Sequence, residues 1–593
     1  MASQVIDVMS DSTGKEQVKA LESMAKSMQE MAKIMGGTDG TYDAMILANL
    51  DGTKEKYEAM QRAWFKANGA ENADPVKLTG LVNKWYALTR QLVKDFDGWV
   101  EFYNPNTSSL SNGTRKGDFE NMECVPSTDT VAGKDDFAGN PLFAVTTCNW
   151  EMHGIGPIIT AIKGISPDFE QSNPNKYVGV LQMSGYHWWT ERSESDTVEK
   201  EGYRATYSAA YRHIEPLPEA VKMDGTVREW VLHGKYMAGR RSDGSLSCCS
   251  GQAPAINMSH NNLHDCAYKN GANLGAAYSG GTSADRSFVI LMAKLLFASK
   301  TLDGILNGCF NFSVDSPAQV AETGVKRVIL KKGEGARFWV GCTVMVGKWS
   351  SQYDYYERGL DATNSKPLLR VTAIEEETIN DTVYDVVYTD AAEPFDTVVN
   401  GDKVAGTTYL ATMEWYSGVN DKLLGNNGAL NVTDGKHTIS IQGIEMCNGS
   451  YEVLADTIMM LWKDDTAYYY TPYIVKEAEK QSTGITSDYI DTGINVVQPE
   501  TGSWQYIKHQ AYKNGFYFAD ETGGSSSTYE KDAIWMSAKT ENTTREFLAF
   551  GALGYGVPHC GLSCFRGGNG VGSSDWIFCA RLSPNGNRGN WQA

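Results

Sequence analysis

Few residues of this 593-residue chain have the types and spacing that catalysis or metal binding requires. His260 and His264, in SHNNLHDC, are four residues apart, a spacing that would place two imidazoles on one face of a helix, as a metal site can use. The intervening asparagines and the preceding serine favour a loop with hydrogen-bonded, structural histidines instead. We therefore expect neither a metal site nor a cofactor.

Patterns for nucleophilic or acid–base catalysis are equally weak. Ser250 and Ser259 lie near His260, but the GxSxG turn of serine hydrolases is missing. The eleven cysteines are scattered without metal-ligand spacing, so we expect reduced thiols in a protein made in a cytoplasm. Acidic runs such as IEEETIND are expected to be solvated, because the net charge is −19.

The charge and hydropathy pattern excludes several classes of partner. A net charge of −19 argues against a nucleic-acid partner, since phosphate binding needs clustered Lys and Arg. The longest apolar run, FVILMAKLLF from Phe288, is too short for a membrane span and contains Lys294, so it predicts a buried helix. The first residues lack a basic segment followed by an apolar run, so no secretory signal is expected.

Two helical patterns precede the rest of the chain. The first is a heptad seam, which predicts either one amphipathic helix packed on its own chain or a short coiled coil that holds several copies together. Its apolar positions are Leu21, Met24, Met28, Met31 and Met35. The second runs from Asp74-Pro75 towards Pro105, with one apolar face. That face comprises Leu78, Leu81, Val82, Trp85, Leu88, Leu92, Phe96 and Trp99.

Changes in composition predict a multidomain fold with five regions. They are a coiled-coil helix (1–37), a helical attachment region (38–110), an α+β carrier domain (111–324), a small β-barrel or sandwich insert (325–412) and an α+β ligand-binding domain (413–593). In the last region, YEVLADTIMMLWKD is expected to be helical. The run GANLGAAYSGG is expected to be a flexible surface loop.

The C-terminal region combines large aromatic residues with Gly, Asn and Ser. Aromatic side chains supply contact area at low entropic cost, and small polar residues supply adaptable hydrogen bonds. Segments such as TGSWQYIKHQAYKNGFYFADETGG and NRGNWQA therefore favour a binding surface on a rigid scaffold.

One further stretch resembles a known family. REFLAFGALGYGVPHCGLSCFRGGNGVGSSDWIFCARLSPNGNRGNW looks like the variable, C-type-lectin-like domain of phage proteins that retroelements diversify. YVGVLQMSGYHWWT, GYRATYSAAYRHIEPLPEAV, LSCCSGQAPAINMSHNN and SKTLDGILNGCFNF resemble carrier regions of gut-phage tail or head fibre proteins. The resemblance covers residues 141–593 and implies a C-terminal domain with the C-type-lectin fold.

The resemblance also implies a set of ligand-binding residues. In that family, AAY codons for asparagine become NNY codons, which encode neither Trp nor Lys, so Trp576 is expected to be framework. The residues compatible with such codons are Gly554, Tyr555, Val557, His559, Phe565, Arg566, Asn569, Asp575, Ile577 and Phe578. Tyr555, His559 and Asn569 lie in Gly-rich turns and are expected to be exposed. The apolar members Phe565, Ile577 and Phe578 could equally belong to the core.

The function that the resemblance implies is binding rather than catalysis. We expect a virion-surface receptor-binding protein, made in the host cytoplasm, that recognises a bacterial surface protein or glycan. Its N-terminal helices would join other virion proteins and form a homotrimer. The alternatives are a capsule-degrading enzyme with a carboxylate pair in a groove, a formylglycine-generating-enzyme-like head using Cys560, Cys564 and Cys579, and a structural fibre or decoration protein without a ligand.

Overall fold

Strands dominate the computed structural model, in which they account for 35% of the residues and helices for 15%. The structure describes residues 53–103, 113–189, 193–195, 198–207, 215–272, 274–350, 354–355, 358–362, 368–556 and 559–589. The predicted coiled-coil helix of residues 1–37 lies outside these ranges. The predicted fold class, with a helical N-terminal region followed by α+β domains, is wrong. The regular structure of the described residues is mostly strand and includes four α-helices.

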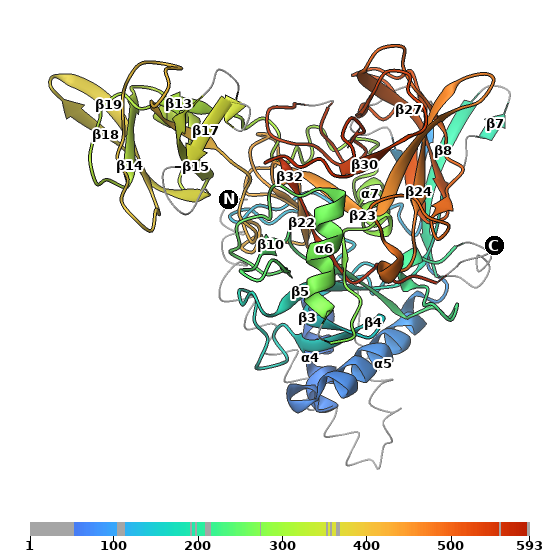
Figure 1. The fold of residues 1–593 in the computed structure, drawn as a ribbon. Coiled ribbons are helices and arrows are strands. Elements are labelled where there is room, and N and C mark those ends of the chain that lie inside the picture. Colours follow the sequence, from blue (N-terminus) through green and yellow to red (C-terminus); the bar gives the residue numbers. More distant parts are fainter. Residues whose placement is uncertain are drawn as a thin grey trace.

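The first described elements are two helices that pack on their own chain. Helices α4 (Lys54–Ala67) and α5 (Pro75–Val93) start at capping residues whose side chains accept backbone N–H groups, Thr53 and Asp74. Figure 1 shows both at the lower end of the molecule, with α5 against β4 (Gly156–Ile162). The prediction that this helix continues through Trp99 is wrong. Helix α5 ends at Val93, and strand β1 (Asp97–Tyr103) follows.

Two antiparallel sheets form the region that follows the helices. One has the order β4-β3-β5-β9, and the other has the order β2-β1-β8-β6 with β7 beside β8. Their remaining strands are β2 (Gly113–Gly117), β3 (Val145–His153), β5 (Tyr177–Met183), β6 (Tyr186–Trp189), β7 (Ser193–Ser195), β8 (Val198–Thr206) and β9 (Trp230–Gly234). Every residue of β5 is buried, as expected of a strand with neighbours on both sides and side chains packed on both faces.

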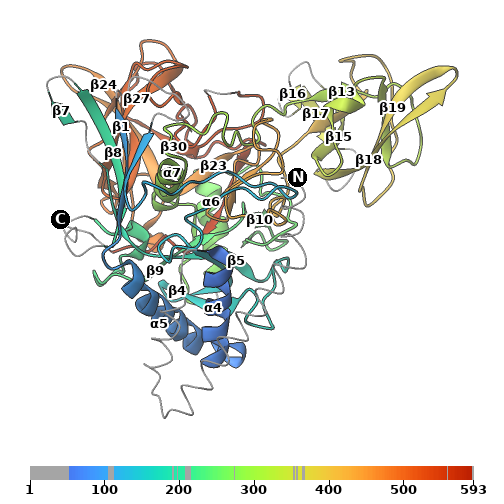
Figure 2. The same ribbon diagram turned by 180° about the vertical axis from the view of Figure 1, so that it is seen from behind.

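Strands from the middle of the chain form a separate lobe, which projects to one side in Figures 1 and 2. Its sheet has the order β13-β20-β15-β18-β19-β14, with β17 beside β15 and β16 beside β17. The strands are β13 (Asp315–Pro317), β14 (Arg327–Lys331), β15 (Thr343–Trp349), β16 (Asp354–Tyr355), β17 (Arg358–Ala362), β18 (Leu369–Ile379), β19 (Thr382–Thr389) and β20 (Thr408–Thr412). The residues predicted to be a β-rich insert thus supply most of this lobe.

The C-terminal region contributes a ten-stranded sheet with the order β25-β24-β23-β30-β31-β29-β27-β28, to which β26 and β32 add at β24 and β23. The strands are β23 (Tyr451–Lys463), β24 (Tyr468–Ile474), β25 (Ile490–Asp491), β26 (Val496–Val497), β27 (Ser503–Lys513), β28 (Phe516–Thr522), β29 (Ala533–Met536), β30 (Thr543–Ala549), β31 (Phe565–Arg566) and β32 (Phe578–Cys579).

This sheet overturns the expected C-type-lectin-like α+β domain. The described residues after 412 contain no α-helix, and the segment predicted to be a helix, YEVLADTIMMLWKD, forms the central strand β23. Ten of the thirteen β23 residues are buried, so its apolar residues do not alternate with polar ones. An uninterrupted apolar run of this kind is compatible with either a buried strand or a buried helix.

Two further helices pack on the sheets, the first with one face exposed and the second enclosed. Helix α6 (His260–Gly271) packs against β23, and α7 (Ser283–Phe297) is buried at every residue. The α7 N-terminus is fixed by a capping box between Thr282 and Asp285. Lys294, in the middle of α7, is buried 2.6 Å from the Glu530 carboxylate, so its charge is compensated. The predicted buried helix is therefore present, although it begins earlier than Phe288.

Residues 578–589, termed the C-terminal segment, are buried throughout and join the two halves of the chain. Strand β33 (Leu582–Ser583) pairs with β12 (Ser279–Gly280) at the start of α7. Arg588 lies 2.9 Å from Asp456 of β23, and the Asn585 amide donates to Asp285 at 2.8 Å. Two smaller strand pairs complete the fold. They are β10 (Gly239–Arg240) with β11 (Leu246–Ser247), and β21 (Ile439–Ile441) with β22 (Ile444–Met446).

Candidate binding surface

Five partly exposed side chains gather on one face of the C-terminal sheet. Trp504 of β27 lies directly opposite Trp535 of β29, and Trp535 lies opposite Arg566 of β31. Side chains of directly paired residues project from the same face of a sheet, so these three form a row across it. Tyr555 and His559, from the loop before β31, lie against Trp504. We call Trp504, Trp535, Tyr555, His559 and Arg566 the aromatic patch.

Ring contacts join four of the five patch residues, Trp504, Tyr555, His559 and Arg566. The His559 ring stacks on Trp504 with a centroid distance of 4.5 Å, and the Tyr555 ring meets Trp504 edge-on at 6.0 Å. The Arg566 guanidinium donates to the Tyr555 hydroxyl at 3.4 Å and lies 6.0 Å from the centre of that ring. Each such contact contributes about 0.5–1.5 kcal/mol, so the rings are held in place before any partner arrives.

Glycines allow the surrounding loops to lie close to these rings. Gly554, next to Tyr555, has a φ of +87°, a conformation that residues with a Cβ rarely adopt. A Cβ at Gly568 would lie 2.6 Å from the Trp535 ring, so only glycine lets the strand end pass over it. The glycines of this region therefore allow the loops to lie close to the aromatic patch.

The patch carries one permanent positive charge, that of Arg566. Partial burial lowers the pKa of His559, so its imidazole is neutral at pH 7 and contributes a flat aromatic surface with polar edges. Asp575 also lies in this loop region, and burial raises the pKa of its carboxyl.

The structure divides the sequence-predicted ligand residues into two groups. Gly554 is exposed, and Tyr555, His559, Arg566, Asn569 and Asp575 are partly exposed. Phe565, Ile577 and Phe578 are buried in the core, so they support the surface from beneath and do not contact a partner there. Trp576 is buried too, as expected for framework, whereas Val557 lies outside the described residues.

The predicted ligand residues did not include two members of the patch, Trp504 and Trp535, although Trp504 lies in the segment TGSWQYIKHQAYKNGFYFADETGG that was expected to favour a binding surface. Both lie well before the stretch that resembles a variable region, and only the β27–β29 pairing brings them together. Their signal in the sequence was weak: each is a tryptophan within a short β-rich segment flanked by turn residues.

The structure corrects the interpretation of the SHNNLHDC segment. The segment is helical, not a loop, because His260 begins α6. His260 is buried with its two ring nitrogens 3.1 and 3.0 Å from the backbone carbonyls of Leu454 and Ser482, while His264 faces a pocket. Within the described ranges, no three His, Cys, Asp or Glu residues are grouped as a metal site requires.

The cysteines do not provide the environment of reactive thiols. All eleven are free and buried. Burial raises the pKa of Cys560, Cys564 and Cys579, whereas a nucleophilic cysteine needs a pKa lowered by nearby positive charge. These three residues therefore lack the setting that a formylglycine-generating-enzyme-like head would use.

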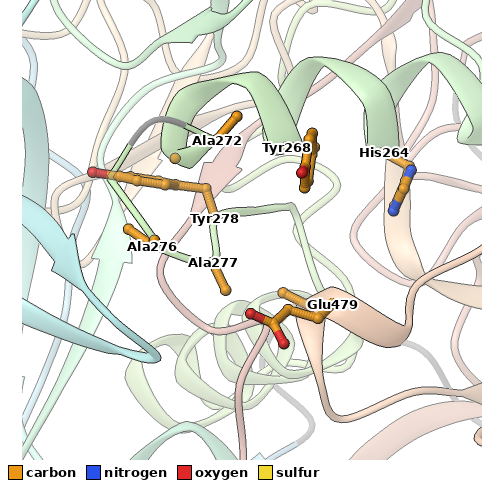
Figure 3. A pocket seen from close by; sticks show the side chains of 10 residues that line it. His264, Tyr268, Ala272, Ala276, Ala277, Tyr278 and Glu479 are labelled. Atoms are coloured by element: carbon orange, nitrogen blue, oxygen red, sulfur yellow. The ribbon is translucent and has the colours of Figure 1, made fainter.

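A small pocket of about 140 Å³ lies beside α6 (Figure 3). Tyr268 and His264 line it from α6, and Glu479 lies on another side. Ala276, Ala277 and Tyr278 complete its wall. The run GANLGAAYSGG, expected to be a flexible surface loop, therefore lines a pocket and is buried from Ala277 onwards. Its lining is mainly alanine, glycine and tyrosine, without a nucleophile next to a base.

Comparisons with known proteins add no family assignment. No protein-family model matches the chain, and no curated protein is significantly similar to it. Among the helices that the structure describes, none is long and apolar enough to cross a membrane.

Proposed function

We propose that this chain is a receptor-binding protein of a phage virion that attaches to a bacterial surface protein or glycan through the aromatic patch. The observation that carries the proposal is the convergence of Trp504, Trp535, Tyr555, His559 and Arg566 on one sheet face. Trp, Tyr and Arg are the residues that most often dominate the energy of protein interfaces.

The scaffold beneath the patch supports this role. The Phe565 ring packs at 4.5 Å on Phe547 and at 5.3 Å on Phe518, which fixes β31 from below. The loops that flank β31 carry exposed or partly exposed small and polar residues such as Gly554, Asn569 and Asp575, as in other adaptable binding surfaces. The resemblance of residues 554–578 to a diversified region is consistent with sequence change in these loops over a constant core.

Display in several copies would strengthen a weak contact. In this proposal other virion components hold the protein, and three copies face the cell together. Simultaneous binding raises the overall affinity through effective concentration, without any new contact. The protein would then need only modest affinity at each aromatic patch.

Adsorption of the purified protein to whole cells tests the proposal. Fluorescently labelled protein is mixed with a panel of gut bacterial isolates, and cell-bound fluorescence is measured. Trp504→Ala and Arg566→Ala should each reduce binding to a positive strain at least tenfold, because truncating an interface hot spot costs about 2 kcal/mol or more.

The matched control is Trp462→Ala. Trp462 is a half-buried tryptophan of the same sheet that stacks on Tyr469 outside the patch, so its loss should leave adsorption unchanged. Equal losses in the patch variants and in Trp462→Ala would contradict a specific surface. Release of soluble saccharide from the cells would favour the capsule-degrading alternative, and the lack of adsorption to any strain would favour a structural virion protein.

A further inference from the structure

A second, polar pocket lies at the other end of the molecule from the aromatic patch. It encloses about 410 Å³ where α4 meets the β3–β4 hairpin and the loops around residues 420–426 and 440–443. Figure 1 shows α4 at the lower end and β27, which carries Trp504, at the upper end. The volume falls within the range of about 300–1,000 Å³ that is usual for small-molecule sites.

The net charge of this pocket is positive, whereas that of the whole protein is negative. Lys54, Arg62, Lys163 and Lys235 line it, against the two carboxylates of Glu58 and Asp421. An excess of cationic groups in a concave site is unexpected in a chain whose net charge is −19. Cationic side chains brought together in a cleft repel one another, and an anion between them relieves that repulsion.

The four cations differ in how far they are already compensated. The Lys54 ammonium donates to the Asn426 side chain at 3.1 Å and lies 4.0 Å from one carboxylate oxygen of Glu58, whose other oxygen lies 3.7 Å from the Arg62 guanidinium. Lys235 is largely buried, donates to the Gly443 carbonyl at 3.0 Å and lies 3.9 Å from the Asp421 carboxylate, and burial lowers the pKa of its ammonium. Lys163 is exposed at the rim, on the turn after β4. A ligand can therefore meet a fixed cation inside the pocket and an adjustable one at its mouth.

The lining also contains a buried amide whose side chain is unpaired within the part of the chain that the structure describes. Asn420 is only 5% exposed, and neither its Nδ2 nor its Oδ1 has a hydrogen-bond partner among the described residues. Leaving a buried polar group unpaired costs about 1–3 kcal/mol, which a hydrogen bond from a pocket ligand would offset. An amide offers both donors and an acceptor, which suits hydroxyl groups.

We propose that this pocket binds an acidic sugar, a hydroxylated ring that carries a carboxylate or a phosphate. The acidic group lies among Lys54, Arg62, Lys163 and Lys235, and ring hydroxyls pair with the Asn420 amide and the Ser440 hydroxyl. The two sources of negative charge, a uronic acid and a sugar phosphate, share this recognition chemistry. The site is independent of the aromatic patch and of the function proposed for it.

Calorimetric titration of the full chain tests this site with defined probes. The probes are glucuronate, glucose 6-phosphate, inorganic phosphate and glucose, at low and at physiological ionic strength. At least one of the two acidic sugars should bind ten times more tightly than both glucose and inorganic phosphate, and the tighter one identifies the acidic group. Equal affinity for glucose would overturn the role of the cations, and equal affinity for phosphate would overturn the role of the ring.

Three variants assign the binding to this pocket. Lys163→Glu reverses the charge of an exposed rim residue and should weaken the acidic sugar at least tenfold, whereas Lys84→Glu, a matched change on α5 away from the pocket, should not. Asn420→Leu should also weaken binding tenfold without lowering the melting temperature, because it removes an unpaired polar group from a buried position. Unchanged affinity in Lys163→Glu and Asn420→Leu would overturn the proposal.

Discussion

Replacing Arg581 should show how strongly the C-terminal segment holds the protein together. Arg581 is buried, and its Nε lies 3.3 Å from both carboxylate oxygens of Glu452 on β23. Its Nη1 donates to the Gly234 carbonyl at 2.9 Å and its Nη2 to the Glu445 carbonyl at 2.7 Å. One guanidinium therefore joins β9, β22, β23 and the C-terminal segment.

The magnitude follows from what Arg581→Met would leave behind. Met has a similar length but cannot donate, so the buried Glu452 carboxylate loses its counter-charge and two carbonyls lose a donor. Removing one partner of a buried ion pair costs about 3–5 kcal/mol, and an orphaned buried carbonyl adds about 1 kcal/mol or more. The resulting loss of about 5–7 kcal/mol is comparable with the 5–15 kcal/mol that stabilises a typical domain.

The assay is thermal and urea-induced unfolding of four proteins: wild type, Arg581→Met, Glu452→Leu and the double variant. The double variant removes both charges, and replacing a whole buried pair by apolar residues is often neutral. It should therefore recover more than half of the loss seen in Arg581→Met, a coupling that a double-mutant cycle measures directly.

The loss should also depend on pH in a defined direction. Burial raises the pKa of Glu452 even beside Arg581, and removal of Arg581 raises it further. A carboxyl whose folded-state pKa exceeds its unfolded value holds its proton better when folded, so stability falls as the pH rises above the unfolded pKa of about 4.3. Arg581→Met should thus differ least from wild type near pH 5 and most near pH 8. An unchanged melting temperature, or additive single losses in the double variant, would refute this account.

Two further substitutions test the core beneath the candidate surface. Burial raises the pKa of Glu546 to about 8, so this carboxyl favours folding below about pH 4.3 and opposes it increasingly as the pH rises towards 8. Glu546→Gln keeps an acceptor for the His260 N–H and should exceed wild-type stability by more than about 1 kcal/mol at pH 8.5 but match it at pH 4.5, as measured by urea unfolding. Phe565→Ala removes a fully buried ring from its contact with Phe547 and should lower the free energy of unfolding by about 3–5 kcal/mol in the same assay, and a loss under 1 kcal/mol would contradict its place in the core.

The sequence predicted local features better than their assembly. The burial of α7 followed from an apolar run with one lysine, and the strands of the side lobe followed from short β-rich runs between turns. For α6, the serine and asparagines of SHNNLHDC suggested a loop, which is wrong. The Ser259 side chain, taken as a sign of a loop, accepts the Asn262 N–H and caps the helix. Serine favours both situations, and tertiary contacts with β23 decide between them.

The candidate surface shows why site residues were only partly predictable. Phe565 and Arg566 are neighbours in the sequence, but successive side chains of a strand point to opposite faces, so one lies in the core and the other in the aromatic patch. The face of each residue depends on the register of β31 with β29 and β30. That register arises from pairing between distant segments, which local sequence patterns do not encode.

The burial of the C-terminal segment has a consequence for the order of events during synthesis. Residues 578–589 leave the ribosome after β9, α7 and β23, the elements that they join. Until then Asp456 lacks its contact with Arg588 and the Asn585 amide does not reach Asp285. The nascent chain therefore carries these polar groups without their final partners until residues 578–589 have emerged. Its central sheet reaches the native arrangement only when residues 578–589 insert, so the partly assembled sheet is exposed to aggregation and proteolysis until they emerge.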